Sequence, residues 1–230
     1  RAMINYRNQY GSLSGEPYKT IAFATDAPLK LTNLAYDRNF LGVGLSVIND
    51  NAGVVGFNNV HITGNVSYAI DLGGSDVNPH FLSVGLQIGF MQRSLNLDKG
   101  TWENQWTGID FNQGISSGEA LTGTVNEANF DLGGGISWYN SVDEHTKLLI
   151  GASMLHANAP KVNILGSDEA LMRKYIGHVS LAATPEGSDV TYLPNLFVMF
   201  QGPNRIIDVG SEIEFSFWDR TAFTDFRNNL

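Results

Sequence analysis

Residues 41–47 read L-G-V-G-L-S-V, so bulky aliphatic residues take every second position and glycine or serine fills the positions between. Successive side chains of a β-strand point to opposite faces. One face of this strand is therefore aliphatic and the other nearly bare. A soluble sheet usually places polar residues opposite its apolar face. The pattern favours a strand whose bulky face meets lipid and whose small face lines a crowded interior.

The same period of two returns along the whole chain, with turn-rich sequence between the segments. No stretch reaches the roughly 18 apolar residues that a transmembrane helix needs. The longest connections are 98–129 and 157–171. The pattern predicts ten strands and the start of an eleventh near Thr221: 1–9, 19–25, 39–48, 60–70, 82–97, 130–139, 147–156, 174–183, 190–200 and 205–217.

Consecutive hairpins with alternating faces suit either a transmembrane barrel or a soluble β-sandwich. Charged residues make up only 16% of the chain, against about 25% in an average soluble domain, and aromatic residues lie near several strand ends. We therefore predict an all-β fold, an antiparallel up-and-down transmembrane β-barrel, and keep the sandwich as the alternative.

An open edge in this barrel would expose unpaired backbone groups to lipid. Ten or eleven strands with an open end therefore need either further strands or a partner that covers the edge, unless the fold is soluble, and we favour further strands. We expect residues 1–230 to form a single barrel domain that lacks its C-terminal strands.

The lengths of the connections indicate an orientation. Outer-membrane barrels have short periplasmic turns and longer external loops. The turns at 140–146 and 184–189 are short, whereas the connections after the fifth and seventh strands are long. We expect the two long connections to face the outside of the cell.

Charge and composition exclude several partners. The net charge is −9, from 14 basic and 23 acidic residues, whereas a nucleic-acid partner would need a basic stripe. The chain has no cysteine, which excludes disulfides and thiolate metal sites.

No motif indicates an enzyme. Gly114–Gly118 has the spacing of a nucleophile elbow, but this motif needs a strand before it and a helix after it, and neither is expected in this Gly/Ser-rich stretch. The five histidines show no metal-ligand spacing. We expect no catalytic residue, no metal and no cofactor.

Several segments, in this order, resemble the PorP/SprF family of outer-membrane proteins associated with the type IX secretion system. The resemblance covers most of the chain, and G-V-G-L-S-V-I-N-D contributes most to it. The segments that carry it are 1–10 (R-A-M-I-N-Y-R-N-Q-Y), 17–20 (P-Y-K-T), 42–50 (G-V-G-L-S-V-I-N-D), 67–70 (S-Y-A-I), 85–89 (G-L-Q-I-G) and 132–140 (L-G-G-G-I-S-W-Y-N).

The resemblance implies a barrel of about fourteen strands in the bacterial outer membrane, of which ten or eleven lie in this chain. It implies a non-enzymatic protein that binds, exports or anchors a large secreted adhesin with a C-terminal sorting domain, in some cases for gliding motility. The implied partners are this cargo, other type IX secretion or outer-membrane components, and membrane lipid. A generic outer-membrane channel is the alternative within the barrel class.

Two sets of residues are candidates for function. Polar residues on the small faces of the strands are expected to face the lumen: Arg7, Asn65, Gln87, Asp131, Asp208, Glu212 and Glu214. Three aromatic residues in the connection 98–129 are expected either to grip a partner, since tryptophan is enriched at binding hot spots, or to fold back and plug the barrel: Trp102, Trp106 and Phe111.

Overall fold

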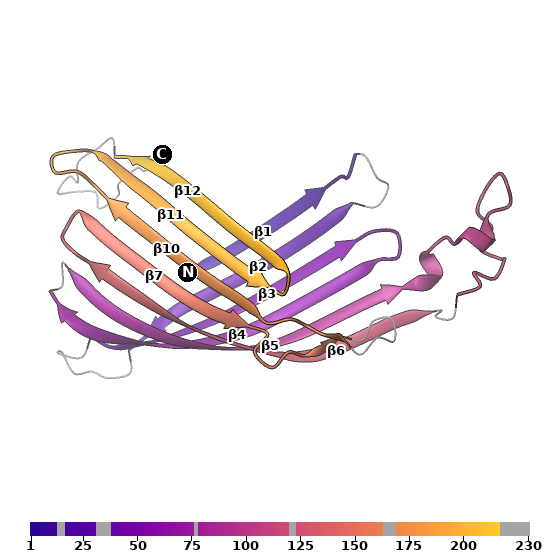
Figure 1. The fold of residues 1–230 in the computed structure, drawn as a ribbon, viewed down its shortest axis with the longest axis horizontal. Helices are drawn as coiled ribbons and strands as arrows, with labels where there is room; N and C mark the ends of the chain where they lie inside the picture. Colours follow the sequence, from indigo (N-terminus) through magenta and orange to yellow (C-terminus); the bar gives the residue numbers. More distant parts are fainter. Residues whose placement is uncertain (13–16, 31–37, 76–77, 120–122, 163–168, 217–230) are drawn as a thin grey trace.

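The computed structural model describes residues 1–12, 17–30, 38–75, 78–119, 123–162 and 169–216. Ten strands form one antiparallel sheet in which each strand pairs with its neighbours in sequence. The sheet curls into a trough, with β1 and β12 as its outermost strands (Figure 1). The ten strands are β1 (Ala2–Gln9), β2 (Tyr18–Leu29), β3 (Phe40–Ala52), β4 (Phe57–Gly74), β5 (Pro79–Asn96), β6 (Thr124–Ser141), β7 (Thr146–Leu155), β10 (Lys174–Ala183), β11 (Val190–Gln201) and β12 (Asn204–Phe215).

Two connections contain short regular elements. The single-turn 3-10 helices η1 (Leu97–Lys99) and η2 (Glu103–Gln105) follow β5, and the two-residue strands β8 (Lys161–Val162) and β9 (Glu169–Ala170) pair between β7 and β10. Within the described residues, no helix is long and apolar enough to cross a membrane.

The predicted up-and-down arrangement of ten strands is confirmed, and the sandwich interpretation is wrong because the large sheet does not divide into two. Several boundaries differ, because β2 runs on to Leu29 and β4 extends from Phe57 to Gly74. β6 begins at Thr124, which shortens the expected connection, and β3 runs on to Ala52, with the turn made by Gly53 and Gly56 at φ of 72° and 59°. The expected eleventh strand near Thr221 lies outside the described residues.

The register separates the side chains onto two faces. Thr63 pairs with Gly89, which pairs with Asp131, so these positions share the concave face. Thr63, Asp131 and the nearby Met91 are buried, whereas Leu86 on the convex face is 70% exposed. A cavity of about 720 Å³ lies on the concave face, and the polar residues in its lining include Ser46, Asn65, Ser67, Gln87 and Ser153.

Glycine is required on the concave face because neighbouring side chains already fill the space. A Cβ atom at Gly151 would overlap the His178 ring, and one at Gly135 would lie 2.9 Å from the Cβ atom of Ser153. The alternation of glycine and aliphatic residues in the sequence therefore reflects crowding inside the trough as well as an apolar environment outside it.

Aromatic residues on the convex face form two rows. On β6, Phe130 and Trp138 lie eight residues apart, and on β11 so do Tyr192 and Phe200. Eight residues of strand span roughly 26 Å, which for tilted strands matches an apolar band of about 25 Å with aromatic girdles at both interfaces. Phe90 packs edge-on against Phe130, with ring centroids 6.1 Å apart.

Beyond the row that contains Phe90 and Phe130, β5 and β6 continue toward a projecting segment, residues 97–119. This segment, here called the arm, extends away from the end of the sheet (Figure 1). We call this end of the sheet the arm end.

Neighbouring residues on β5 provide a test of the two faces. Leu86→Arg places a charge between the two aromatic rows on the convex face and should lower the free energy of unfolding in lipid vesicles by about 2–4 kcal/mol. Gln87→Arg, on the concave face, should change it much less. Urea titration of vesicle-inserted protein measures both, and equal effects would contradict the assignment of the faces.

Candidate functional site

All seven predicted lumen-facing residues lie on the concave face, as the strand register shows. Asn65 and Gln87 are direct cross-strand partners. Arg7 lies on the edge strand β1, and the carboxylates of Asp208, Glu212 and Glu214 lie on the opposite edge strand β12. The concave face therefore collects the polar residues of the sheet, but the structure does not bring them together as one cluster.

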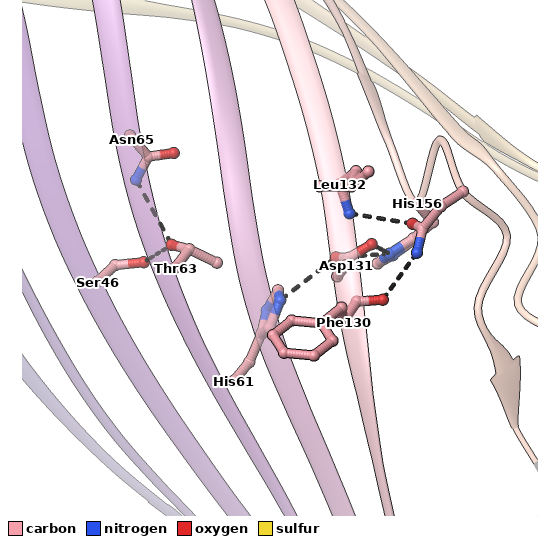
Figure 2. A network of polar contacts seen from close by, with 9 residues as sticks. Ser46, His61, Thr63, Asn65, Phe130, Asp131, Leu132 and His156 are labelled. Atoms are coloured by element: carbon pink, nitrogen blue, oxygen red, sulfur yellow. Dashed lines mark hydrogen bonds and ion pairs between the residues drawn. The ribbon is translucent and has the colours of Figure 1, made fainter.

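One of these residues forms the centre of a buried polar network. The Asp131 carboxylate is 0% exposed, and both its oxygens lie 2.9 Å from Nδ1 of His156. Nε2 of His61 lies 3.4 Å from Oδ2 of the same carboxylate. Figure 2 shows the two imidazoles approaching Asp131 from different segments of the chain.

His156 is held in place by an unusual segment at the end of β7. Its φ is 56°, a left-handed conformation that is uncommon for residues other than glycine. The next backbone N–H, of Ala157, donates to Leu132 O at 2.8 Å. The Asn158 amide donates to Phe130 O at 2.8 Å and accepts from Leu132 N at 3.0 Å. Residues 156–158 thus continue the hydrogen bonding of β6 where β7 has ended.

The network is chemically suited to fixing this segment. A buried carboxylate needs hydrogen-bond donors, and His156 supplies one. Among the described residues, no hydroxyl group hydrogen-bonds to either imidazole, and no group of three His, Asp or Glu side chains could hold a metal ion. The neighbouring Ser46 and Thr63 hydroxyls bond to each other at 2.5 Å.

Sequence reasoning selected Asp131 but missed both histidines. His61 and His156 are far apart in sequence and follow no ligand spacing. One signal in the sequence could have identified His61. It lies two and four residues before Thr63 and Asn65, so its side chain is expected on the same face of the strand.

The arm carries two of the three predicted aromatic residues at its tip. Trp106 and Phe111 form an isolated antiparallel bridge with ring centroids 4.9 Å apart. A turn joins them, in which Thr107 N donates to Asp110 O at 2.9 Å and the Thr107 hydroxyl to Asp110 Oδ1 at 2.5 Å. Trp106 is 50% exposed, Phe111 47%, and Ile109 in the turn 90%.

The third aromatic residue, Trp102, lies at the base of the arm and not at the tip. Between base and tip, the buried Gln105 side chain accepts from Trp102 N at 3.1 Å and donates to Ile115 O at 3.0 Å. Asn104 donates to Ser117 O at 3.1 Å. The arm is therefore a folded unit with its own hydrogen bonds, and it projects away from the trough (Figure 1).

An up-and-down sheet with an apolar convex face between two aromatic rows defines a transmembrane β-barrel protein of the outer-membrane class. The model of one family, described as type IX secretion system membrane protein PorP/SprF, matches residues 1–224, and the chain belongs to this family. It is thus an outer-membrane protein of the type IX secretion system, a secretion component associated with the other parts of that system. No curated protein and no solved structure matches the chain.

Removing the Asp131 carboxylate tests how much the buried network contributes to the stability of the protein. Asp131→Ala leaves two imidazoles without their shared partner, and the loss of a buried hydrogen bond to a carboxylate costs about 1.5–3 kcal/mol. We expect the free energy of unfolding in lipid vesicles to fall by that order. Asp208→Ala, an exposed carboxylate on the same face, is the control and should change it by no more than about 0.5 kcal/mol. An unchanged Asp131→Ala variant would show that the network is dispensable.

Proposed function

We propose that this protein binds a secreted protein at the cell surface and exports or anchors it as part of the type IX secretion system. The proposed cargo is a large adhesin with a C-terminal sorting domain, with gliding motility as one process it serves. The observation that carries this proposal is the exposed aromatic tip of the arm.

The tip has the features of a protein-binding surface. Tryptophan and other aromatic residues dominate the energetics of interfaces, and Trp106, Phe111 and Ile109 expose a large apolar area together. The tip hairpin is closed by its own hydrogen bonds, so a partner would not bear the entropy of ordering it. A folded arm is therefore better suited to recognition than a flexible loop of the same composition.

The electrostatics of the arm favour a partner with basic groups around an apolar centre. Asp98, Glu103, Asp110 and Glu119 lie in the arm with a single basic residue, Lys99. Charges at the rim of an interface chiefly affect the rate of association. A basic rim on the cargo would therefore speed its capture in a salt-dependent manner.

The same proposal assigns roles to the two faces of the sheet. Residues 1–230 belong to one barrel domain, the convex face contacts membrane lipid, and the concave face lines the lumen. The arm end lies outside the cell, because the two longest connections are at this end and the turns at 142–145 and 184–189 are at the other. The side chains proposed to line the lumen are those of Arg7, Asn65, Gln87, Asp131, Asp208, Glu212 and Glu214.

The lack of native cysteine allows a direct test of orientation. A single cysteine at Ile109, which is 90% exposed at the arm tip, should react with a membrane-impermeant maleimide in intact cells. A cysteine at Val142, in the turn at the opposite end, should react only after the outer membrane is opened. The reverse pattern would invert the orientation.

Loss of the tip tests partner binding. The double variant Trp106→Ala/Phe111→Ala should reach the outer membrane in normal amounts but retain much less cargo. Two hot-spot residues at about 2 kcal/mol each correspond to a loss of affinity of roughly a thousandfold. Affinity purification from native membranes, with quantification of the co-purifying secreted protein, measures the loss.

Tyr10→Ala is the matched control, since Tyr10 is an exposed aromatic residue at the same end but outside the arm. It should retain cargo at the level of the unmodified protein. Full retention by the double variant would exclude the tip as the binding surface.

A further inference from the structure

Two polar hollows lie at the base of the arm, away from its aromatic tip. Each has a volume of about 450 Å³, and they share Asp98 and Gln113. One is closed by Trp102 and by residues 114–117 of the returning arm segment, and the other by the β3–β4 turn with Asn51 and Lys99. We call the two together the arm-base pocket.

Hydrogen bonds between three separate segments build this pocket. Asn96 N donates to Val55 O at 2.9 Å, which joins β5 to the β3–β4 turn. Leu97 N donates to Gly123 O at 2.9 Å, and Gly123 N donates to Asp98 Oδ1 at 2.8 Å. The Leu97 side chain is buried beneath them. The walls are therefore fixed relative to one another and to the end of the sheet.

The pocket offers hydrogen-bonding groups that the protein itself leaves available. Within the described part of the chain, the exposed Gln113 amide has no protein partner, and the Lys99 ammonium forms no ion pair. The Ser116 and Ser117 hydroxyls accept weak bonds from Gly118 N and Glu119 N, at 3.4 and 3.3 Å. A hydroxyl that accepts still has its own hydrogen to donate.

One wall adds a flat apolar surface. The half-buried Trp102 ring packs over Gly100, where an added Cβ would lie 3.4 Å from Cε2 of the indole and 3.3 Å from Cγ1 of Val55. Because Gly100 has no side chain, the Trp102 ring can pack closely against it beside the pocket. An aromatic face thus stands next to an amide, a carboxylate and two hydroxyls.

This combination fits a ligand that has many hydroxyl groups along its edges and C–H groups on its faces. Amide, carboxylate and hydroxyl side chains match the alternating donors and acceptors of neighbouring hydroxyls, and an aromatic ring packs against an apolar face. A phosphate-rich ligand fits poorly, because Lys99 is the one cation in the lining and Asp98 stands beside it. We propose that the arm-base pocket binds a carbohydrate.

The proposal goes beyond the partner-binding role and uses different residues from the tip. Saturation-transfer NMR of the full chain in a detergent without a sugar headgroup tests it with four probes: glucose, galactose, N-acetylglucosamine and glucuronate. We expect at least one probe to give a saturable signal. Binding of a small polar ligand by a few hydrogen bonds and one ring corresponds to a Kd of about 1 mM, or roughly −4 kcal/mol.

Variants then locate the binding. Gln113→Ala removes an amide without protein contacts, so the fold should be unaffected and the affinity for that probe should fall about tenfold, the equivalent of one hydrogen bond. Trp102→Ala should abolish the signal. Glu103→Gln, on the arm but outside the pocket lining, is the control and should bind as the unmodified protein does.

No saturable signal with any of the four probes would overturn the proposal, as would a Gln113→Ala variant that binds the responding sugar as tightly as Glu103→Gln. The tip variant Trp106→Ala/Phe111→Ala should keep full sugar binding. Its loss of cargo and the presence of sugar binding are measured separately, so either proposal can fail while the other stands.

Discussion

The structure depends on the pairing of every strand with a neighbour along nearly its whole length. A strand in lipid has no water to satisfy its backbone groups, so the adjacent strand must supply each partner. Between β1 and β12 the sheet meets this need with continuous antiparallel ladders, and among the described residues only the outer edges of these two strands have no neighbour. Where β7 is shorter than β6, the Asn158 amide supplies both a donor and an acceptor to β6, and the Asp131 carboxylate fixes the segment that carries it. The buried network is thus explained by the same requirement as the sheet.

Much of this fold could be predicted from the sequence because the period of two is a direct property of strand geometry. Residues 41–47 and 82–90 each have one aliphatic face, and their strands are found as expected. The prediction was less accurate where contacts with other strands, and not the local sequence pattern, determine the structure. Residues 124–129 are mostly polar and show little alternation, yet they are strand because β5 pairs with them. The Asn-Asp-Asn sequence at 49–51 has turn composition, yet Asn58 donates to Asn49 at 2.8 Å and Thr20 to Asp50 at 2.6 Å, which extends β3.

Some features of the candidate sites could likewise be predicted from the sequence, and others could not. The alternation of side chains was enough to place Asn65, Gln87 and Asp131 on one face of the sheet, because each lies opposite the aliphatic residues of its own strand. The alternation of side chains could not show that His156 contacts Asp131, because that contact depends on how the chain turns after β7. Nor could it separate Trp102 from Trp106, which lie four residues apart in one connection but occupy the base and the tip of the arm.

In the proposed orientation, the length of β5 and β6 beyond the aromatic rows affects how a partner meets the arm at the cell surface. From Phe90 to Asn96 the strand advances by roughly 20 Å along its own axis, which for a strand tilted by about 35–45° is about 15 Å along the membrane normal, so the arm starts clear of the bilayer interface. The paired ends of β5 and β6 form a stiff ribbon of this length, which holds the tip of the arm beyond the lipid headgroups. A partner that meets the tip approaches from the surrounding medium and avoids the cost of displacing lipid. In the proposed function, its capture would therefore depend on salt and on its own concentration more than on the lipid composition of the membrane.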